Sequence, residues 1–213
     1  MQYPMNMELK NVRCVVLGGG HVALRKIKTM LTAEAEVVVI SPDAEPEILQ
    51  LAADGKISYS RATYTHGDLI GAKLVILATN DSDANLAACD EARSLGILVN
   101  APKEPEHSDF SVPASLRRGS LLVTVSTGNN APGLARFIRE KLEEDFPEVL
   151  GEWLEIVHRL REELKEKLAT SRDREAFWRY ALNDRLLDMV KQGNLQKAEA
   201  DIRNAALGFR AES

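Results

Sequence analysis

Cysteines, aromatic residues and excess positive charge are all scarce in this chain. Its 213 residues include two cysteines, Cys14 and Cys89, and its formal net charge is -5. Neither cysteine has a Cys-x-x-Cys partner, so we expect no disulfide framework and no cysteine-ligated metal. Both lie in apolar segments, where reduced, buried thiols of a cytoplasmic protein are expected. The negative charge argues against a nucleic-acid partner.

Long hydrophobic runs and metal-binding patterns are also absent. Residues 74–78 form one of the longest apolar runs, far below the ~20 residues that a membrane-spanning helix needs. Residues 1–8 carry no basic segment followed by an apolar one, so we expect no signal peptide and no membrane partner. The four histidines are scattered without ligand spacing, which predicts no metal site.

A glycine-rich turn follows the first apolar run. Residues 18–23 read Gly-Gly-Gly-His-Val-Ala, the G-x-G-x-x-A form of the dinucleotide-binding fingerprint. In this form Gly18 permits a tight turn, Gly20 allows a pyrophosphate to approach, and Ala23 lets the following helix pack on the sheet. The N-terminus of that helix offers N–H groups to phosphate. The context favours a nucleotide site over a strand–helix turn without a ligand.

The first half of the chain alternates strand and helix signals. We expect strands at residues 13–17, 36–41, 57–62, 74–79 and 97–100, and helices at residues 23–32, 45–53 and 83–95. Nearly continuous apolar strands that alternate with helices predict an α/β domain, with a Rossmann-like parallel sheet covered on both faces.

The pattern changes after residue 112. A basic turn is expected at residues 117–119, then a strand over 120–126 and a helix over 134–144. From residue 147 onward the apolar residues recur at three- and four-residue spacing, which is typical of amphipathic helices. We therefore divide the chain into a nucleotide-binding domain at 1–112, a small strand–helix segment at 113–146 and an all-helical domain at 147–213.

Several motifs occur in order along nearly the whole chain. They are residues 18–26 (Gly-Gly-Gly-His-Val-Ala-Leu-Arg-Lys), 78–81 with Asn85, 96–100, 110–113, 126–128 with 131–132, 177–178 and 183–186. This set resembles the N-terminal family of siroheme synthase, the precorrin-2 dehydrogenases, some of which are also sirohydrochlorin ferrochelatases. No methyltransferase domain follows within these 213 residues, so the resemblance is to the stand-alone form.

The resemblance implies a reaction and partners. Precorrin-2 would be oxidised to sirohydrochlorin with NAD as cofactor, and in bifunctional members ferrous or cobaltous ion is then inserted into the product. Whether this chain inserts a metal is left open. The resemblance also implies a homodimer, in which the segment at 113–146 serves dimerisation, and the cysteines and the missing signal peptide predict a cytoplasmic location.

The cofactor is expected at the carboxyl ends of the strands, where open α/β sheets bind ligands. The residues expected to bind it are Gly18, Gly20, His21, Val22, Pro42, Asp43, Thr79 and Asn80. Asp43 comes slightly later than the usual ribose-binding acid, so a solvated loop residue explains it equally well. No arginine follows the second strand, which favours NAD over NADP.

At the presumed catalytic position the chain departs from the family. Where members of the family resemble Asn-Val-Val-Asp, residues 100–103 read Asn-Ala-Pro-Lys, so Lys103 takes the place of the acid–base Asp. Both reactions must remove protons from the macrocycle, and a protonated lysine accepts none unless burial lowers its pKa. Glu104 and Asp109 are the candidate substitutes. Lys103 is explained equally by a contact with a substrate carboxylate or by exposure to solvent.

Three interpretations remain open. Glu104 takes over as the base, or dehydrogenation needs little help from a base while chelation weakens, or the protein has lost catalysis and binds NAD or a tetrapyrrole as a sensor or carrier. A nucleotide-sensing regulatory domain is a further alternative, against which the motifs at 177–178 and 183–185 argue.

A second candidate site lies at residues 126–128. The resemblance implies that Ser126, Thr127 and Gly128 lie near the tetrapyrrole. Hydroxyl and loop N–H groups can bind its carboxylates, and the N-terminus of the next helix favours negative charge. The same residues also suit a plain helix cap, and both roles are compatible.

Overall fold

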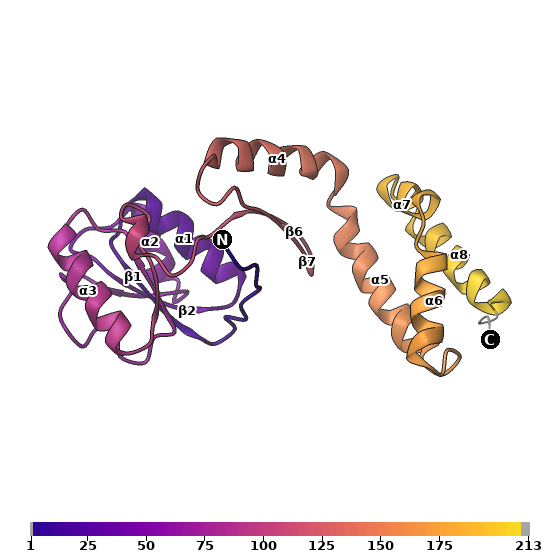
Figure 1. The fold of residues 1–213 in the computed structure, drawn as a ribbon, viewed down its shortest axis with the longest axis horizontal. Helices are drawn as coiled ribbons and strands as arrows, with labels where there is room; N and C mark the ends of the chain where they lie inside the picture. Colours follow the sequence, from indigo (N-terminus) through magenta and orange to yellow (C-terminus); the bar gives the residue numbers. More distant parts are fainter. Residues whose placement is uncertain (1, 210–213) are drawn as a thin grey trace. The chain divides into compact units, whose positions relative to one another are not determined.

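The computed structural model describes residues 2–209, which divide into two compact units between Val112 and Pro113 (Figure 1). Each unit has its own buried core, and each is described by itself. Within the described part of the chain, no helix has the length and apolar character needed to cross a membrane.

The first unit is built on a five-stranded sheet in the order β3-β2-β1-β4-β5, and all its strands are parallel. The strands are β1 (Arg13–Leu17), β2 (Glu36–Ile40), β3 (Ser58–Ser60), β4 (Leu74–Leu77) and β5 (Leu98–Asn100); the helices are α1 (His21–Thr32), α2 (Pro46–Ala53), α3 (Ser82–Ser94) and the short η1 (Pro105–His107). The α/β, Rossmann-like prediction is confirmed.

Both faces of the sheet are buried, which explains the nearly continuous apolar strands. On one face, Cys14 and Val16 pack with the buried residues of α1 and with Ile48 of α2. On the other face, Val15 and Leu17 pack with the buried residues of α3. Alternate residues of β1 thus enter two separate cores, as expected for a strand in the middle of a three-layer domain.

The second unit begins with an antiparallel hairpin of β6 (Ala114–Arg118) and β7 (Leu121–Val125), followed by α4 (Pro132–Asp145). We expected a basic turn at residues 117–119, but Arg117 and Arg118 belong to β6. Sequence reasoning missed this strand because it is short, and only Leu116 among its residues is buried. The side chain of Arg118 is nearly buried, and its Nε donates to the Phe146 carbonyl at 2.7 Å.

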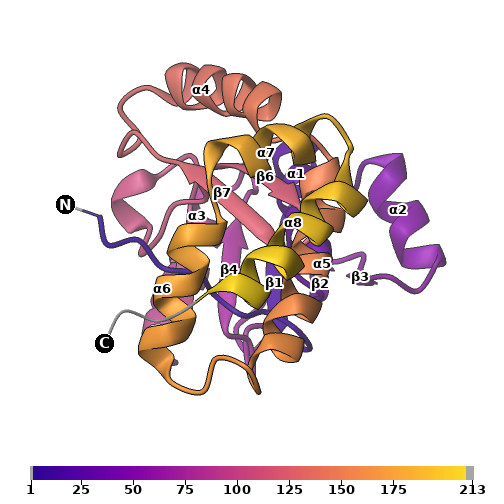
Figure 2. The same ribbon diagram turned by 90° about the vertical axis from the view of Figure 1, so that its right-hand side faces the viewer.

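Four further helices complete this unit: α5 (Val149–Leu164), α6 (Ser171–Ala181), α7 (Asp184–Lys191) and α8 (Leu195–Gly208). Figure 2 shows α7 and α8 side by side, and buried residues of all four helices share one core around Phe177. α7 begins after Leu182, because the side chain of Asn183 accepts the Leu186 N–H at 3.0 Å and caps the helix. Leu182 is consequently exposed.

Candidate cofactor and catalytic site

The candidate site lies at the carboxyl edge of the parallel sheet. The segments that leave β1, β2, β4 and β5 at this edge contain residues 18–20, 41–43, 78–81 and 101–104. β1 and β4 are neighbours, and their helices α1 and α3 pack on opposite faces. This is the switch point of a doubly wound sheet, where such folds bind their ligands.

Glycine is required at the first two positions of the turn, because neighbouring backbone atoms leave no room for a Cβ atom. Gly18 has φ +109°, and a Cβ added there would lie 2.5 Å from the Ala78 carbonyl oxygen. A Cβ on Gly19 would lie 2.2 Å from the Asp43 carbonyl oxygen. Both contacts are too short for any side chain, so these glycines hold the β1 turn against the loops after β4 and β2.

Gly20 differs from the other two because a Cβ there would meet no atom of the described chain within 4 Å. It is the N-cap of α1, which begins at His21, two residues earlier than expected. The first backbone bond of the helix runs from Leu24 N to Gly20 O at 3.0 Å, so the preceding N–H groups have no partner within the helix. Open space beside such donors fits a diphosphate.

The side chains at the start of α1 project away from the protein. His21 is almost fully exposed, and its Nδ1 is 4.0 Å from Oε1 of Glu45. Val22 is also exposed. With these side chains turned to solvent, the backbone N–H groups are what His21 and Val22 can offer to a phosphate.

The loop after β2 is fixed by contacts with the end of β3. Ser41 Oγ donates to the Asp43 carbonyl at 2.6 Å, and the Tyr59 hydroxyl donates to the Ser41 carbonyl at 2.9 Å. Arg61 Nε donates to the Pro42 carbonyl at 3.1 Å. Sequence reasoning missed Arg61 because it follows β3, and only the parallel pairing of Ile40 with Ser60 brings it beside this loop.

At the ends of β4 and β5, polar side chains form a connected chain of contacts. Thr79 Oγ1 lies 2.7 Å from Oδ1 of Asn85, and Asn85 Nδ2 donates to Oε2 of Glu104 at 3.3 Å. Asn85 is only 2% exposed. The motif that includes Asn85 was noted in the sequence, but nothing in its spacing indicated a link to Glu104.

The two other catalytic candidates have different partners. Lys103 Nζ donates to the Thr79 carbonyl at 3.2 Å and also to the Asn80 side-chain oxygen. Asp109 lies beside the middle of β5, where its Oδ2 accepts the Val99 N–H at 2.8 Å and its own N–H donates to the Val99 carbonyl at 2.8 Å. Lys103 and Glu104 therefore lie at the carboxyl edge with Thr79 and Asn80, and Asp109 does not.

Residues 126–128 belong to the second unit and precede α4. Thr127 Oγ1 accepts the Ala131 N–H at 3.2 Å, and the Gly128 N–H donates to Ser126 Oγ at 3.3 Å. Gly128 has φ +62°, a left-handed conformation that glycine adopts easily. These contacts stay within the loop before α4, whose N-cap is Ala131 without a side-chain hydrogen bond, so residues 126–128 do not cap the helix as considered from the sequence.

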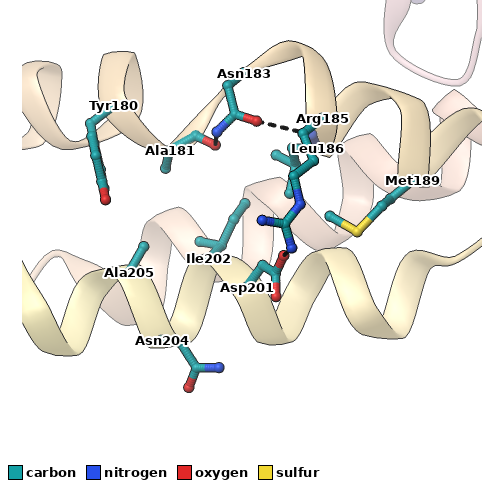
Figure 3. A pocket seen from close by; sticks show the side chains of 10 residues that line it. All are labelled: Tyr180, Ala181, Asn183, Arg185, Leu186, Met189, Asp201, Ile202, Asn204 and Ala205. Atoms are coloured by element: carbon teal, nitrogen blue, oxygen red, sulfur yellow. Dashed lines mark hydrogen bonds and ion pairs between the residues drawn. The ribbon is translucent and has the colours of Figure 1, made fainter.

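A shallow groove in the second unit is drawn in Figure 3. The residues that line it are Tyr180, Ala181, Asn183, Arg185, Leu186, Met189, Asp201, Ile202, Asn204 and Ala205. Arg185 points to Asp201, with 3.4 Å between Nη2 and Oδ2, so the two charged groups of the groove pair with each other. None of the predicted site residues is among these ten.

Burial shifts the pKa of Lys26 and of Cys14, which lie away from the carboxyl ends of the strands. Lys26 is half-buried on α1, and burial, assisted by the charge of Arg25, lowers its pKa to about 8. Burial raises the pKa of the Cys14 thiol to about 11, so it stays protonated at neutral pH. Among residues 2–209 no group of three or more His, Cys, Asp or Glu side chains could hold a metal ion.

Comparisons with known proteins match both units. Residues 5–114 match the family described as "Putative NAD(P)-binding", and residues 149–205 match the "Sirohaem synthase dimerisation region". The siroheme synthase of Methylobacillus flagellatus is 34% identical over 205 residues, which are 96% of this chain and 44% of that protein. The siroheme synthase of Photorhabdus laumondii is 36% identical over 199 residues, 93% of this chain and 42% of that protein. The chain thus spans less than half the length of these relatives.

A solved structure has a similar fold along most of the chain. It is titled "SirC, precorrin-2 dehydrogenase" and covers 95% of this chain and 100% of its own, with a TM-score of 0.72 and 24% identity. At this identity the similarity establishes the fold alone.

Proposed function

The chain belongs to the family that forms the N-terminal region of siroheme synthases, and from this premise we propose that it oxidises precorrin-2 to sirohydrochlorin with NAD+. The observation that carries the proposal is the glycine turn at the switch point. Its open side at Gly20, next to the first N–H groups of α1, suits a dinucleotide pyrophosphate. The similarity to siroheme synthases along 96% of the chain supports the choice of substrate.

The reaction removes a hydride and a proton from the macrocycle. When bound, NAD+ supplies the hydride acceptor, and the protein must supply the proton acceptor. We assign that role to Glu104. Its Oε2 accepts one hydrogen bond from Asn85, a neutral donor, which leaves acceptor positions of the carboxylate available for a proton. The buried Asn85 limits how far the carboxylate can move.

Lys103 and Asp109 suit other roles. The ammonium group of Lys103 donates to two acceptors that follow β4, so it ties the loops after β4 and β5 together. The carboxylate of Asp109 bonds to the backbone of β5, where it stabilises the strand. We therefore propose that neither residue accepts the proton from the substrate.

A second reaction to consider is the insertion of a metal ion into sirohydrochlorin. With ferrous or cobaltous ion as the second substrate, we expect sirohydrochlorin chelation to be slow. The positive charge of Lys103 stands at the strand end that holds Glu104 and disfavours a dication there. The same substitution favours the second candidate function, a protein that binds NAD or a tetrapyrrole without turnover.

We also infer a cytoplasmic homodimer. The match to a dimerisation region supports the dimer, as do Leu134, Phe137 and Ile138, three apolar residues exposed on α4. Apolar side chains gathered on one helix in this way are often covered by a partner. The cytoplasmic location is supported by the two cysteines, which are free and buried.

The decisive experiment follows the absorbance of freshly generated precorrin-2 with the purified protein and NAD+, in the presence and absence of ferrous or cobaltous ion. We expect sirohydrochlorin and NADH to form without metal. If the protein does not accelerate metal insertion above the rate measured without protein, the chelatase part of the proposal is wrong. If NAD+ binds and no sirohydrochlorin forms, the protein is a binding protein and the dehydrogenase proposal fails.

A further inference from the structure

The loop after β2 brings together two side chains with opposite preferences for a coenzyme. In Rossmann-like domains an acid at this loop bonds the ribose 2′-hydroxyl of NAD, whereas an arginine accommodates the 2′-phosphate of NADP. Here Asp43 and Arg61 both reach the loop, and Arg61 Nη2 lies 3.5 Å from Oδ1 of Asp43. The acid alone would predict NAD, and the arginine alone would predict NADP.

The loop is held directly against the glycine turn. The Asp43 carbonyl oxygen lies 2.2 Å from where a Cβ of Gly19 would be, and Glu45 N donates to the Gly19 carbonyl at 2.8 Å. The backbone of Asp43 is therefore in contact with the turn that suits the pyrophosphate. This contact identifies Asp43, although it comes late in the sequence, as a neighbour of the adenosine end of the cofactor site.

Arg61 is anchored by the backbone and open to the solvent. Its Nε donates to the Pro42 carbonyl at 3.1 Å, which fixes the base of the guanidinium beside the loop. The side chain is 78% exposed, and that of Asp43 is 92% exposed. At this exposure the ion pair is weak, so a ligand can displace either partner at little cost.

We propose that Asp43 and Arg61 together set the coenzyme preference: Asp43 selects NAD+ and masks an affinity for NADP+ that Arg61 confers. The inference rests on the proposed function only in taking a nicotinamide dinucleotide as the cofactor. The Asp43 carboxylate bonds the ribose hydroxyls and repels a 2′-phosphate. Without it, the guanidinium of Arg61 is left to pair with that phosphate, for which its planar fork is well suited.

The test measures binding of NAD+ and of NADP+ to the full chain by titration calorimetry, without tetrapyrrole. Asp43→Asn should weaken NAD+, strengthen NADP+ and shift the affinity ratio by about tenfold or more, the effect of one charge-assisted hydrogen bond. Arg61→Gln should weaken NADP+ by about tenfold and leave NAD+ nearly unchanged. The double variant should lose the gain in NADP+ affinity that Asp43→Asn produces.

A matched control is Lys56→Gln, which removes a positive charge just before β3 instead of just after it. This variant should leave both affinities unchanged. The three altered side chains are exposed, so the melting temperature should stay at the wild-type value in every variant.

Two results would overturn the inference while the dehydrogenase proposal stands. One is an unchanged affinity ratio in Asp43→Asn with NAD+ still bound. The other is a double variant that binds NADP+ as tightly as Asp43→Asn does, since another group would then hold the phosphate. A wild-type protein that binds neither coenzyme would contradict the proposed function itself.

Discussion

Asn85 donates a hydrogen bond from its side-chain amide to the carboxylate of Glu104 at 3.3 Å. The donor is buried on α3 and the acceptor lies in the loop after β5, so the contact joins two segments at the carboxyl edge of the sheet. Glu104 is thereby held at the strand end, next to Lys103.

If Glu104 accepts the proton, Glu104→Gln should lower kcat for sirohydrochlorin formation by about 100-fold, the usual contribution of a general base. The amide keeps the shape of the side chain, so binding of NAD+ should not change. NADH formation at saturating precorrin-2 measures the rate, and Glu106→Gln, an exposed position in η1, is the control. A Glu104→Gln protein with the wild-type rate would show that Glu104 does not accept the proton.

Substitutions at two glycines of the turn should have separate effects, one on stability and the other on cofactor binding. Gly19→Ala should lower the melting temperature, because the new Cβ would lie 2.2 Å from the Asp43 carbonyl oxygen and force the loop after β2 to move. Gly20→Ala should leave the melting temperature nearly unchanged and weaken NAD+, because its Cβ would enter the open space that suits the pyrophosphate. Thermal unfolding and NAD+ titration of both variants check the contrast, and a Gly20→Ala protein with full NAD+ affinity would contradict it.

Replacing Lys103 by the acid of the family tests its effect on chelation. Lys103→Asp should raise the rate of cobaltous ion insertion into sirohydrochlorin, because it removes a positive charge and adds a metal-attracting carboxylate. Lys103→Ala removes the charge alone, so comparing the two variants separates the two causes. Equal insertion rates in wild type and Lys103→Asp, measured by absorbance, would show that Lys103 does not limit chelation.

Lys26 should make the stability of the first unit depend on pH. Its pKa is about 8 in the folded protein against 10.5 when unperturbed, so between these values the unfolded chain binds a proton that the folded chain lacks. On account of this group, the free energy of unfolding therefore rises as pH increases from 8 toward 10.5. Below pH 8 the folded protein bears the cost of a half-buried charge.

Lys26→Met should accordingly stabilise the protein at pH 7, and the advantage over wild type should shrink by pH 10. Urea unfolding followed by circular dichroism at both pH values measures the difference. Lys28→Met on the same helix is the control, because Lys28 is exposed and paired with Glu47 at 2.7 Å. An advantage of Lys26→Met that is the same at both pH values would refute the titration of Lys26 as its cause.

Local pattern predicted most of the first unit. The apolar runs and the glycine turn sufficed for the parallel sheet and its helices, because both signals arise within a few residues. The start of α1 at His21 was placed two residues too late, since Gly20 caps the helix without a side chain and leaves no polar signal.

Contacts between distant segments could not be predicted. β6 pairs with β7, and its five residues include two adjacent arginines, which the sequence alone indicated as a turn. Arg61 reaches the loop after β2 only through the pairing of β2 with β3, and Asn85 reaches Glu104 only through the packing of α3. In each case the partner lies elsewhere in the chain, so the sequence around the residue carries no sign of the contact.

The position of Asp109 has a consequence for solubility. β5 is an edge strand of the sheet, and an edge strand with unoccupied backbone groups can pair with a strand of another molecule and begin aggregation. The carboxylate and N–H of Asp109 occupy the N–H and carbonyl of Val99, the central residue of β5. Asp109 thus makes the backbone groups at the middle of this edge unavailable for pairing with a strand of another molecule.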